Sequence, residues 1–170
     1  MNYLGMVVGR REVQVEKKKV EASRSWEALS KKKDLQQFLR FVNFYHKFIK
    51  DFSRIAQSLH ELTENTPWGW LPQHQEAFDT LKNVISDATI LHTLLDTRKL
   101  KIEADSSNFA VGGMLSQLQG GQWKPIAFLS KSLLPTERNY KIYDKELLTI
   151  MTCLDKWHHY VLGATEKFEV

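Results

Sequence analysis

The chain has 170 residues, of which 42% are hydrophobic, and it carries a net charge of +4 at pH 7 with one cysteine. A chain of this size can bury a sizeable core, while one cysteine excludes a disulfide framework and a cysteine-based zinc site within the chain. No apolar run approaches the ~20 residues of a membrane-spanning helix, and the first arginines follow the initial apolar run, unlike those of a signal peptide. We therefore expect an intracellular protein, cytoplasmic or nuclear, whose basic balance permits a polyanionic partner.

The first 16 residues predict a β-hairpin. An apolar run at 3–8 is typical of a strand, and Val13 and Val15 alternate with polar neighbours as its return strand. An isolated two-stranded hairpin is marginally stable in water, so we expect this hairpin to be part of a larger structure.

The region that follows, up to about residue 95, is predicted to be mainly helical. Apolar residues at helical spacing indicate three helical segments, at 17–26, 34–64 and 73–86. The longest of these is predicted to break at 51–53, with Asp34 and Ser53 as the N-caps of its two parts. The segment 88–95 is predicted to be irregular and extended.

Basic side chains give the helical region a positive polar side. They form either an ordinary solvated face or a surface that contacts phosphates, and phosphate contact would make nucleic-acid binding steeply salt-dependent. The candidate nucleic-acid-binding residues, called below the six basic candidates, are Lys31, Lys32, Lys33, Arg40, Lys47 and Lys50.

A strand is predicted to end at Asp105. Leu100, Ile102 and Ala104 alternate with polar residues up to this point, and the residues after Asp105 favour a turn. A carboxylate at the end of a strand can cap the turn or hold a metal ion, and the local pattern leaves both interpretations open.

Two more strands are predicted after this turn. Gly112 and Gly113 in the second strand indicate a bulge or a close approach of another part of the chain. Pro125 cannot donate a ladder hydrogen bond, so the third strand is expected to lie at an edge or to contain a bulge.

A long helix is predicted from about Thr136 to Leu162. At about 100° per residue, its apolar side is expected to consist of Tyr143, Leu147, Ile150, Leu154, Trp157 and Val161. Glu146 lies on the shoulder of this stripe, where it can meet Asp105 at the seam between helix and sheet. Two carboxylates held together in this way suit a hard divalent ion such as Mg²⁺, whereas the alternative is an ordinary ion pair of Glu146 with Lys141 or Lys145.

Two long segments, IEADSSNFAVGGMLSQ and WKPIAFLSKSLLPTERNYKIYDKELLTIMTCLDKWHHYVLGA, closely resemble the RNase H-like domain of gypsy-type LTR retrotransposon Pol polyproteins. Upstream, YLGMVV resembles the hairpin that ends the reverse-transcriptase palm, and KKDLQQFLRFVNFYHKFIKDFSRIAQSLHELT resembles the thumb and connection. The resemblance implies a mixed α+β fold, with a helical thumb/connection-like segment followed by a truncated RNase H-like sheet of three strands and a long helix. It divides the chain into a palm-like hairpin at 1–16, a thumb/connection-like region at 17–95 and an RNase H-like part at 96–170.

The same resemblance assigns chemistry to particular residues. It makes Asp105 and Glu146 the first two catalytic carboxylates and metal ligands, with Mg²⁺ or Mn²⁺ as the ion expected for the family. The alternative is that this truncated chain binds no ion by itself. The implied partners are an RNA–DNA hybrid or another nucleic acid and the rest of the Pol polyprotein, and the implied reaction is two-metal hydrolysis of the RNA strand. The residues FEV at 168–170 match the start of the strand that carries the third aspartate, which the 170 residues do not reach.

Neither a complete RNase H site nor the polymerase signature of the palm is therefore expected within these residues. We expect a fragment of a reverse transcriptase/RNase H that is inactive by itself. The alternative is a non-catalytic remnant that binds nucleic acid or is inert.

Overall fold

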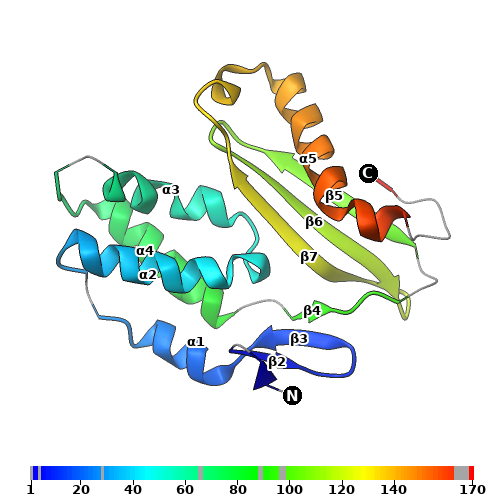
Figure 1. The fold of residues 1–170 in the computed structure, drawn as a ribbon, viewed down its shortest axis with the longest axis horizontal. Coiled ribbons are helices and arrows are strands. Elements are labelled where there is room, and N and C mark those ends of the chain that lie inside the picture. Colours follow the sequence, from blue (N-terminus) through cyan, green and yellow to red (C-terminus); the bar gives the residue numbers. More distant parts are fainter. Residues whose placement is uncertain are drawn as a thin grey trace.

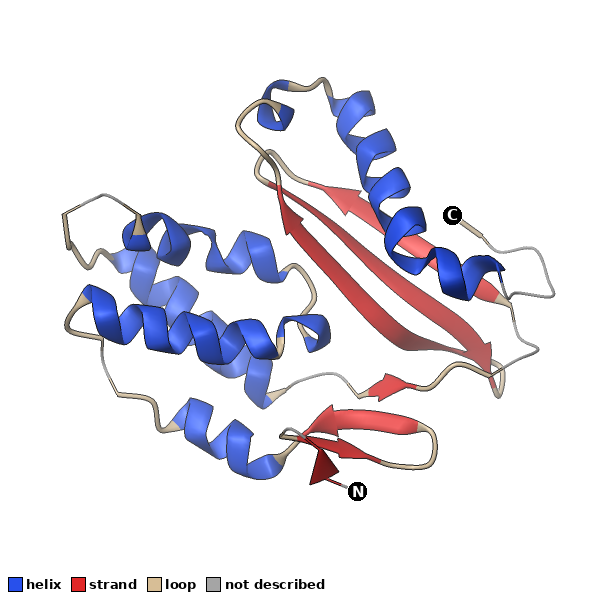
Figure 2. Cartoon of the chain, in the orientation of Figure 1, coloured by secondary structure: helices blue, strands red, loops and turns tan. Residues whose placement is uncertain are grey.

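The computed structural model describes residues 2–3, 5–27, 29–64, 67–87, 90–95, 99–162 and 169–170. Two parts lie side by side: a helical part with a small sheet, and a larger sheet with one long helix along its face (Figure 1). Figure 2 shows that the helices of the first part face one side of the larger sheet, while the long helix covers the other side. The fold is therefore a mixed α+β fold, as the sequence predicts.

The small sheet contains the predicted N-terminal hairpin. Its four antiparallel strands follow the order β1-β2-β3-β4 and span Asn2–Tyr3, Met6–Val8, Glu12–Val15 and Leu91–His92. The segment 88–95 was expected to be irregular and extended, and its described part agrees, since residues 91 and 92 form a short strand and residues 93–95 are irregular; residues 88 and 89 lie outside the described ranges. Met6 and Val15 are buried against Tyr45 and Phe48, so the hairpin is stabilised by packing on the helical part.

The helical part is organised around one apolar core. Its helices are α1 at Lys17–Arg24, α2 at Lys32–Phe44, α3 at Phe52–Thr63 and α4 at Pro72–Ser86, with a 3₁₀ turn, η1, at His46–Phe48. Leu35, Phe38, Leu59, Leu81 and Ile85 are almost completely buried at its centre. These residues lie in the helical segments that the sequence predicts at 34–64 and 73–86, and they pack against one another in this core.

Both predicted N-caps of this region are wrong. Helix α2 begins two residues before Asp34, after Lys31, and the Asp34 carboxylate instead accepts a hydrogen bond from Ser30 Oγ at 3.1 Å. Helix α3 follows Asp51, which adopts a left-handed φ of 56°, and the Ser53 amide donates to Ser130 Oγ of the larger sheet at 2.8 Å. The break runs from Tyr45 to Asp51 and is longer than predicted, because α2 already ends at Phe44 and η1 follows it.

The larger sheet consists of β5 at Leu100–Ser106, β6 at Ala110–Gln119 and β7 at Gln122–Ser132, all antiparallel in this order. β7 is an edge of this sheet, and the register shifts by one residue at Leu115 and Ser116, opposite Pro125. Both parts of the prediction for Pro125 are confirmed, because the bulge removes the need for its missing amide hydrogen.

The long helix α5 spans Ile142–Leu162, and its predicted start is wrong. Glu137–Asn139 form a separate 3₁₀ turn, η2, after which Tyr140 is extended at ψ 149° and ends that turn. The Glu137 carboxylate accepts a hydrogen bond from the Leu134 amide at 2.7 Å, which favours the short turn over a continuous helix.

The buried face of α5 also differs from the predicted stripe. The residues that are buried are Lys145, Thr149, Cys153 and Trp157, whereas Tyr143 and Leu147 are 76% and 59% exposed. The cause lies in β6: a Cβ atom on Gly113 would come within 2.4 Å of Cys153 Sγ and 3.2 Å of Trp157. The glycine thus sets the rotation of α5, and the close approach predicted for the glycine pair is confirmed.

Gln117 joins the segment before β5 to the sheet. This side chain is 1% exposed and makes two hydrogen bonds with the backbone of Leu95, one as acceptor at 2.9 Å and one as donor at 2.8 Å.

Among the described residues, none of the helices is long and apolar enough to cross a membrane.

Candidate metal centre and nucleic-acid surface

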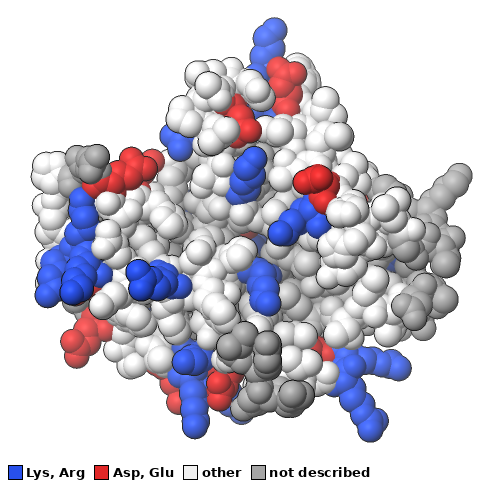
Figure 3. Space-filling model, viewed as in Figure 1, with Lys and Arg blue, Asp and Glu red and all other residues white. Residues whose placement is uncertain are grey.

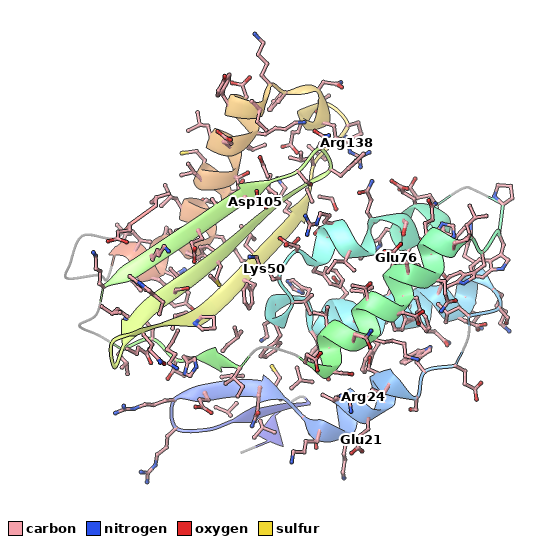
Figure 4. The ribbon with its side chains drawn as sticks, turned by 180° about the vertical axis from the view of Figure 1, so that it is seen from behind. Glu21, Arg24, Lys50, Glu76, Asp105 and Arg138 are labelled. Atoms are coloured by element: carbon pink, nitrogen blue, oxygen red, sulfur yellow. The ribbon has the colours of Figure 1, made fainter. Side chains whose placement is uncertain are left out.

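Asp105 lies one residue before the end of β5, in the position that the sequence predicts. It pairs with Gly112 across the ladder, and a Cβ atom on Gly112 would lie 3.0 Å from Asp51 Oδ1, on the face opposite to α5. Cross-strand partners share a face, so the Asp105 side chain also belongs to this face. In the view from behind the molecule, Asp105 lies near the end of β5, and Lys50 lies toward the helical part (Figure 4).

The turn after β5 is not capped by Asp105. Ser107 Oγ accepts hydrogen bonds from the amides of Phe109 and Ala110 and donates one to the Ala110 carbonyl, at 3.3, 3.0 and 3.0 Å. Within the described residues, the Asp105 carboxylate forms no ion pair of 4.0 Å or less. Of the two interpretations of Asp105, the turn cap is therefore wrong.

Glu146 is exposed on the first half of α5, next to the buried Lys145. The predicted alternative, an ion pair of Glu146 with Lys141 or Lys145, is absent among the described residues. Lys145 Nζ instead lies 3.4 Å from Asn108 Oδ1, in the turn between β5 and β6. The Glu146 carboxylate thus remains available on the shoulder of the helix.

The structure brings Asp105 and Glu146 to one cavity of about 260 Å³ at the end of β5. Its lining residues are Ala104, Asp105, Ser106, Ile142, Glu146, Thr149, Ile150 and Val170. The Asp105 side chain belongs to the face opposite to α5 and Glu146 lies on α5, so the two residues line this cavity around the end of β5 and not within the predicted seam between helix and sheet. Thr149 was missed, although its spacing of four residues from Cys153 places it on the same helical face.

The last described residues lie along the free edge of β5. Glu169 pairs with Lys101 as a parallel bridge, with the Ile102 amide donating to the Glu169 carbonyl at 2.8 Å. The Lys99 ammonium donates a hydrogen bond to the Glu169 carboxylate, which holds the pKa of that carboxyl below its usual range. Phe168, the first residue of the FEV segment, lies outside the described residues, but Val170 lines the same cavity as Asp105 and Glu146.

A second hollow, also about 260 Å³, opens on the face of the sheet opposite to α5. Its lining includes Lys50, Asp51, Glu103 and Asp105. Asp51 is itself paired with Arg54 at 3.3 Å. Asp51 was not among the predicted site residues, and only its position just before a helix could have marked it.

The six basic candidates do not form one compact group. Lys31, Lys33, Arg40, Lys47 and Lys50 are exposed, and Lys32 is half-buried with its ammonium donating to the Glu64 carbonyl. Lys and Arg side chains gather where α2 begins, at one end of the helical part (Figure 3). Lys50 stands apart from that end, since it lies on the hollow that it shares with Asp105.

Across the described residues, His, Cys, Asp and Glu nowhere form a group of three or more that could hold a metal ion. Cys153 is fully buried, and burial raises the pKa of its thiol to about 11, so this cysteine is a core residue. The two carboxylates at the cavity thus have no third acidic partner in the described part of the chain.

Comparison with known proteins agrees with this architecture. The foamy viral protease-reverse transcriptase in complex with RNA/DNA hybrid superimposes on the whole chain with a TM-score of 0.80, at 21% identity and over 23% of its own length. The same viral protein in complex with dsDNA gives a TM-score of 0.81 at 22% identity over 36% of its length. At these identities the likeness concerns the fold.

Sequence relatives are transposon polyproteins. The retrovirus-related Pol polyprotein from transposon opus of Drosophila melanogaster is 31% identical over 96% of this chain and 18% of its own length. The transposon Tf2-3 polyprotein of Schizosaccharomyces pombe is 31% identical over 85% of this chain and 11% of its own length. The chain therefore spans less than a fifth of either relative.

A sequence model of one protein family matches residues 70–170, which is more than half of the chain. This match includes β5, β6, β7 and α5, and hence both carboxylates of the cavity. The chain belongs to the family described as the RNase H-like domain found in reverse transcriptase, and the transposon polyproteins named above are its sequence relatives.

Proposed function

We propose that Asp105 and Glu146 are ligands of a divalent ion, Mg²⁺ or Mn²⁺, and that this segment serves to hydrolyse the RNA strand of RNA–DNA hybrids within a longer Pol product. The observation that carries the proposal is the shared cavity, which two carboxylates from separate elements line in a chain of this family. Both residues are the ones to which the family resemblance assigns this role.

The residues of the cavity fit a hard divalent ion. Carboxylate oxygens are preferred ligands of Mg²⁺, which also keeps several of its water molecules. A water molecule takes up about 30 Å³ of liquid volume, so a cavity of about 260 Å³ has room for a partly hydrated ion. When bound, such an ion would activate water and stabilise the charge on the departing oxygen.

Two carboxylates are too few to hold the two ions of the family's reaction. Because Glu169 is parallel to Lys101, the chain at Val170 runs in the same direction as β5. A strand that continued in this register would pass beside Asp105, where it could supply a further ligand. Asp105 and Glu146 can together hold one ion, and the second ion of the family's reaction needs a further ligand.

We further propose that the six basic candidates contact the phosphates of the nucleic acid. Lys50 is the candidate nearest to the proposed centre, because it shares a hollow with Asp105. For the domains we propose the limits 1–16, 17–95 and 96–170. The limit at 95 is consistent with β5, which begins at Leu100, whereas the small sheet spans the limit at 16, because β4 pairs with β3.

An RNA–DNA hybrid cleavage assay with Mg²⁺ or Mn²⁺ tests the proposal. We expect negligible cleavage by residues 1–170 alone, and cleavage by a longer Pol product that Asp105→Asn or Glu146→Gln abolishes. Asp155→Asn is the matched control, since Asp155 is exposed on α5 and lines neither hollow. Cleavage by the longer product that survives Asp105→Asn would overturn the assignment of the site.

A further inference from the structure

Lys145 is an unusual residue for the buried face of a helix. It is 5% exposed and continues the stripe of Thr149, Cys153 and Trp157 at intervals of four residues. Among the described residues, no carboxylate lies within 4.0 Å of its ammonium. Withdrawing an ammonium from water without an ion pair is costly, and an apolar residue would fill the same space without that cost.

The one hydrogen bond that the Lys145 ammonium forms among the described residues connects α5 to the β5–β6 turn. Its acceptor is Asn108 Oδ1, at 3.4 Å. Asn108 follows Asp105 by three positions, and Lys145 immediately precedes Glu146. The two residues that make this link are therefore next to the two proposed ligands.

The β5–β6 turn, which Lys145 contacts through Asn108, is stabilised by further interactions. Ser107 Oγ bonds within the turn, and the Leu133 amide donates to the Phe109 carbonyl at 2.7 Å. The Arg138 guanidinium lies 5.6 Å from the centre of the Phe109 ring. Because these interactions make the turn rigid, a movement of Asn108 also moves the end of β5, where Asp105 lies.

We propose that Lys145 is a positioning residue, which fixes the separation of Asp105 and Glu146 by linking the turn after β5 to α5. This inference rests on the proposed function, because it assumes that these two carboxylates hold the ion. Side chains that orient metal ligands without touching the metal typically change metal affinity 10- to 100-fold when they are removed.

The test is calorimetric titration of the 170-residue chain with Mg²⁺. Lys145→Met keeps the length and apolar stem of the side chain, and we expect it to weaken Mg²⁺ binding by about 10-fold. Asn108→Ala should cause the same loss, and the double variant should lose no more than either single variant. Lys141→Met, at an exposed position one turn earlier on the chain, is the control and should bind Mg²⁺ normally.

Two further measurements separate positioning from stability and from the proposed function. The melting temperature of Lys145→Met should be unchanged or raised, because a buried ammonium is removed. In the metal-free protein, hydrogen exchange at the Ala110 amide should be faster in both variants than in the wild type. Since Asn108 is exposed, Asn108→Ala tests the link even if Lys145→Met does not fold.

The outcomes are distinct. Mg²⁺ binding that Asp105→Asn weakens but Lys145→Met and Asn108→Ala leave unchanged overturns the positioning role alone. Mg²⁺ binding that is absent, or that Asp105→Asn does not weaken, overturns the proposed function and with it the positioning role. Loss of affinity in all three variants, with normal binding by Lys141→Met, supports both.

Discussion

Gly113 offers the sharpest test of how the sheet and α5 fit together. A Cβ atom at this position would lie 2.4 Å from Cys153 Sγ, and ordinary contacts begin at 3.4 Å, so the sulfur atom would have to retreat by about 1 Å. Cys153 is 0% exposed, which leaves its side chain no solvent to move into. Trp157, at 3.2 Å from the same point, restricts the movement further.

We therefore expect Gly113→Ala to destabilise the protein by about 1–3 kcal/mol, the usual cost of overpacking a core. For a chain of this size, about 1 kcal/mol corresponds to roughly 2–4 °C in melting temperature, so the expected loss is roughly 2–12 °C. The assay is thermal unfolding followed by circular dichroism. Gly69→Ala is the matched control, because a Cβ atom on Gly69 would meet nothing within 4 Å.

The double variant Gly113→Ala/Cys153→Ala identifies the cause. Removing the sulfur atom relieves the clash. In a protein that already carries Cys153→Ala, Gly113→Ala should therefore lower the melting temperature by at most half as much as it does in the wild type. The two effects should be strongly non-additive, as is usual for residues in contact. Equal melting temperatures for Gly113→Ala and the wild type, or simple additivity in the double variant, would refute this account of how α5 is seated.

Two more predictions concern charge. Replacing Lys31, Lys33 and Lys50 by glutamine should weaken binding to an RNA–DNA hybrid and flatten its dependence on salt, as measured by fluorescence anisotropy at several salt concentrations; an unchanged slope would contradict phosphate contact. Because burial raises the pKa of the Cys153 thiol from 9.0 to about 11, its contribution to stability is fully present below pH 9 and decreases as the pH rises from 9 to 11. The free energy of unfolding, measured with denaturant, should therefore fall more between pH 9 and pH 11 in the wild type than in Cys153→Ala. Equal decreases in the two proteins would argue against this contribution of the Cys153 thiol.

Periodicity predicts most of the helical part and the three strands of the larger sheet, because both depend on local alternation of apolar and polar residues. For α5 it is correct only toward the end of the helix, where Leu154, Trp157 and Val161 pack against the core of the sheet. It fails for the first half, because Tyr143 and Leu147 are exposed although they fit an apolar stripe as well as Cys153 does. The choice between those faces is made by Gly113 on another strand, and a single-sequence pattern contains no information about that contact.

For the candidate site, the sequence places Asp105 at a strand end and Glu146 on a helix shoulder, and the structure brings both to one cavity. Asp51 and Asn108 could not be predicted in the same way. Asp51 has a left-handed backbone conformation, and its carboxylate lies next to Gly112 of the sheet. Asn108 accepts a hydrogen bond from the buried Lys145. Both depend on contacts between segments that are distant in the sequence.

The most direct test of the central claim is paramagnetic line broadening by Mn²⁺ in the NMR spectrum of the 170-residue chain. If Asp105 and Glu146 hold a divalent ion together, substoichiometric Mn²⁺ should broaden the amide signals of residues 104–106 and 145–147 first. The variant Asp105→Asn should lose the broadening at both segments, and an excess of Mg²⁺ should reverse it in the wild type. Broadening that is spread over acidic residues in general, or that persists at Glu146 in Asp105→Asn, would contradict a shared site.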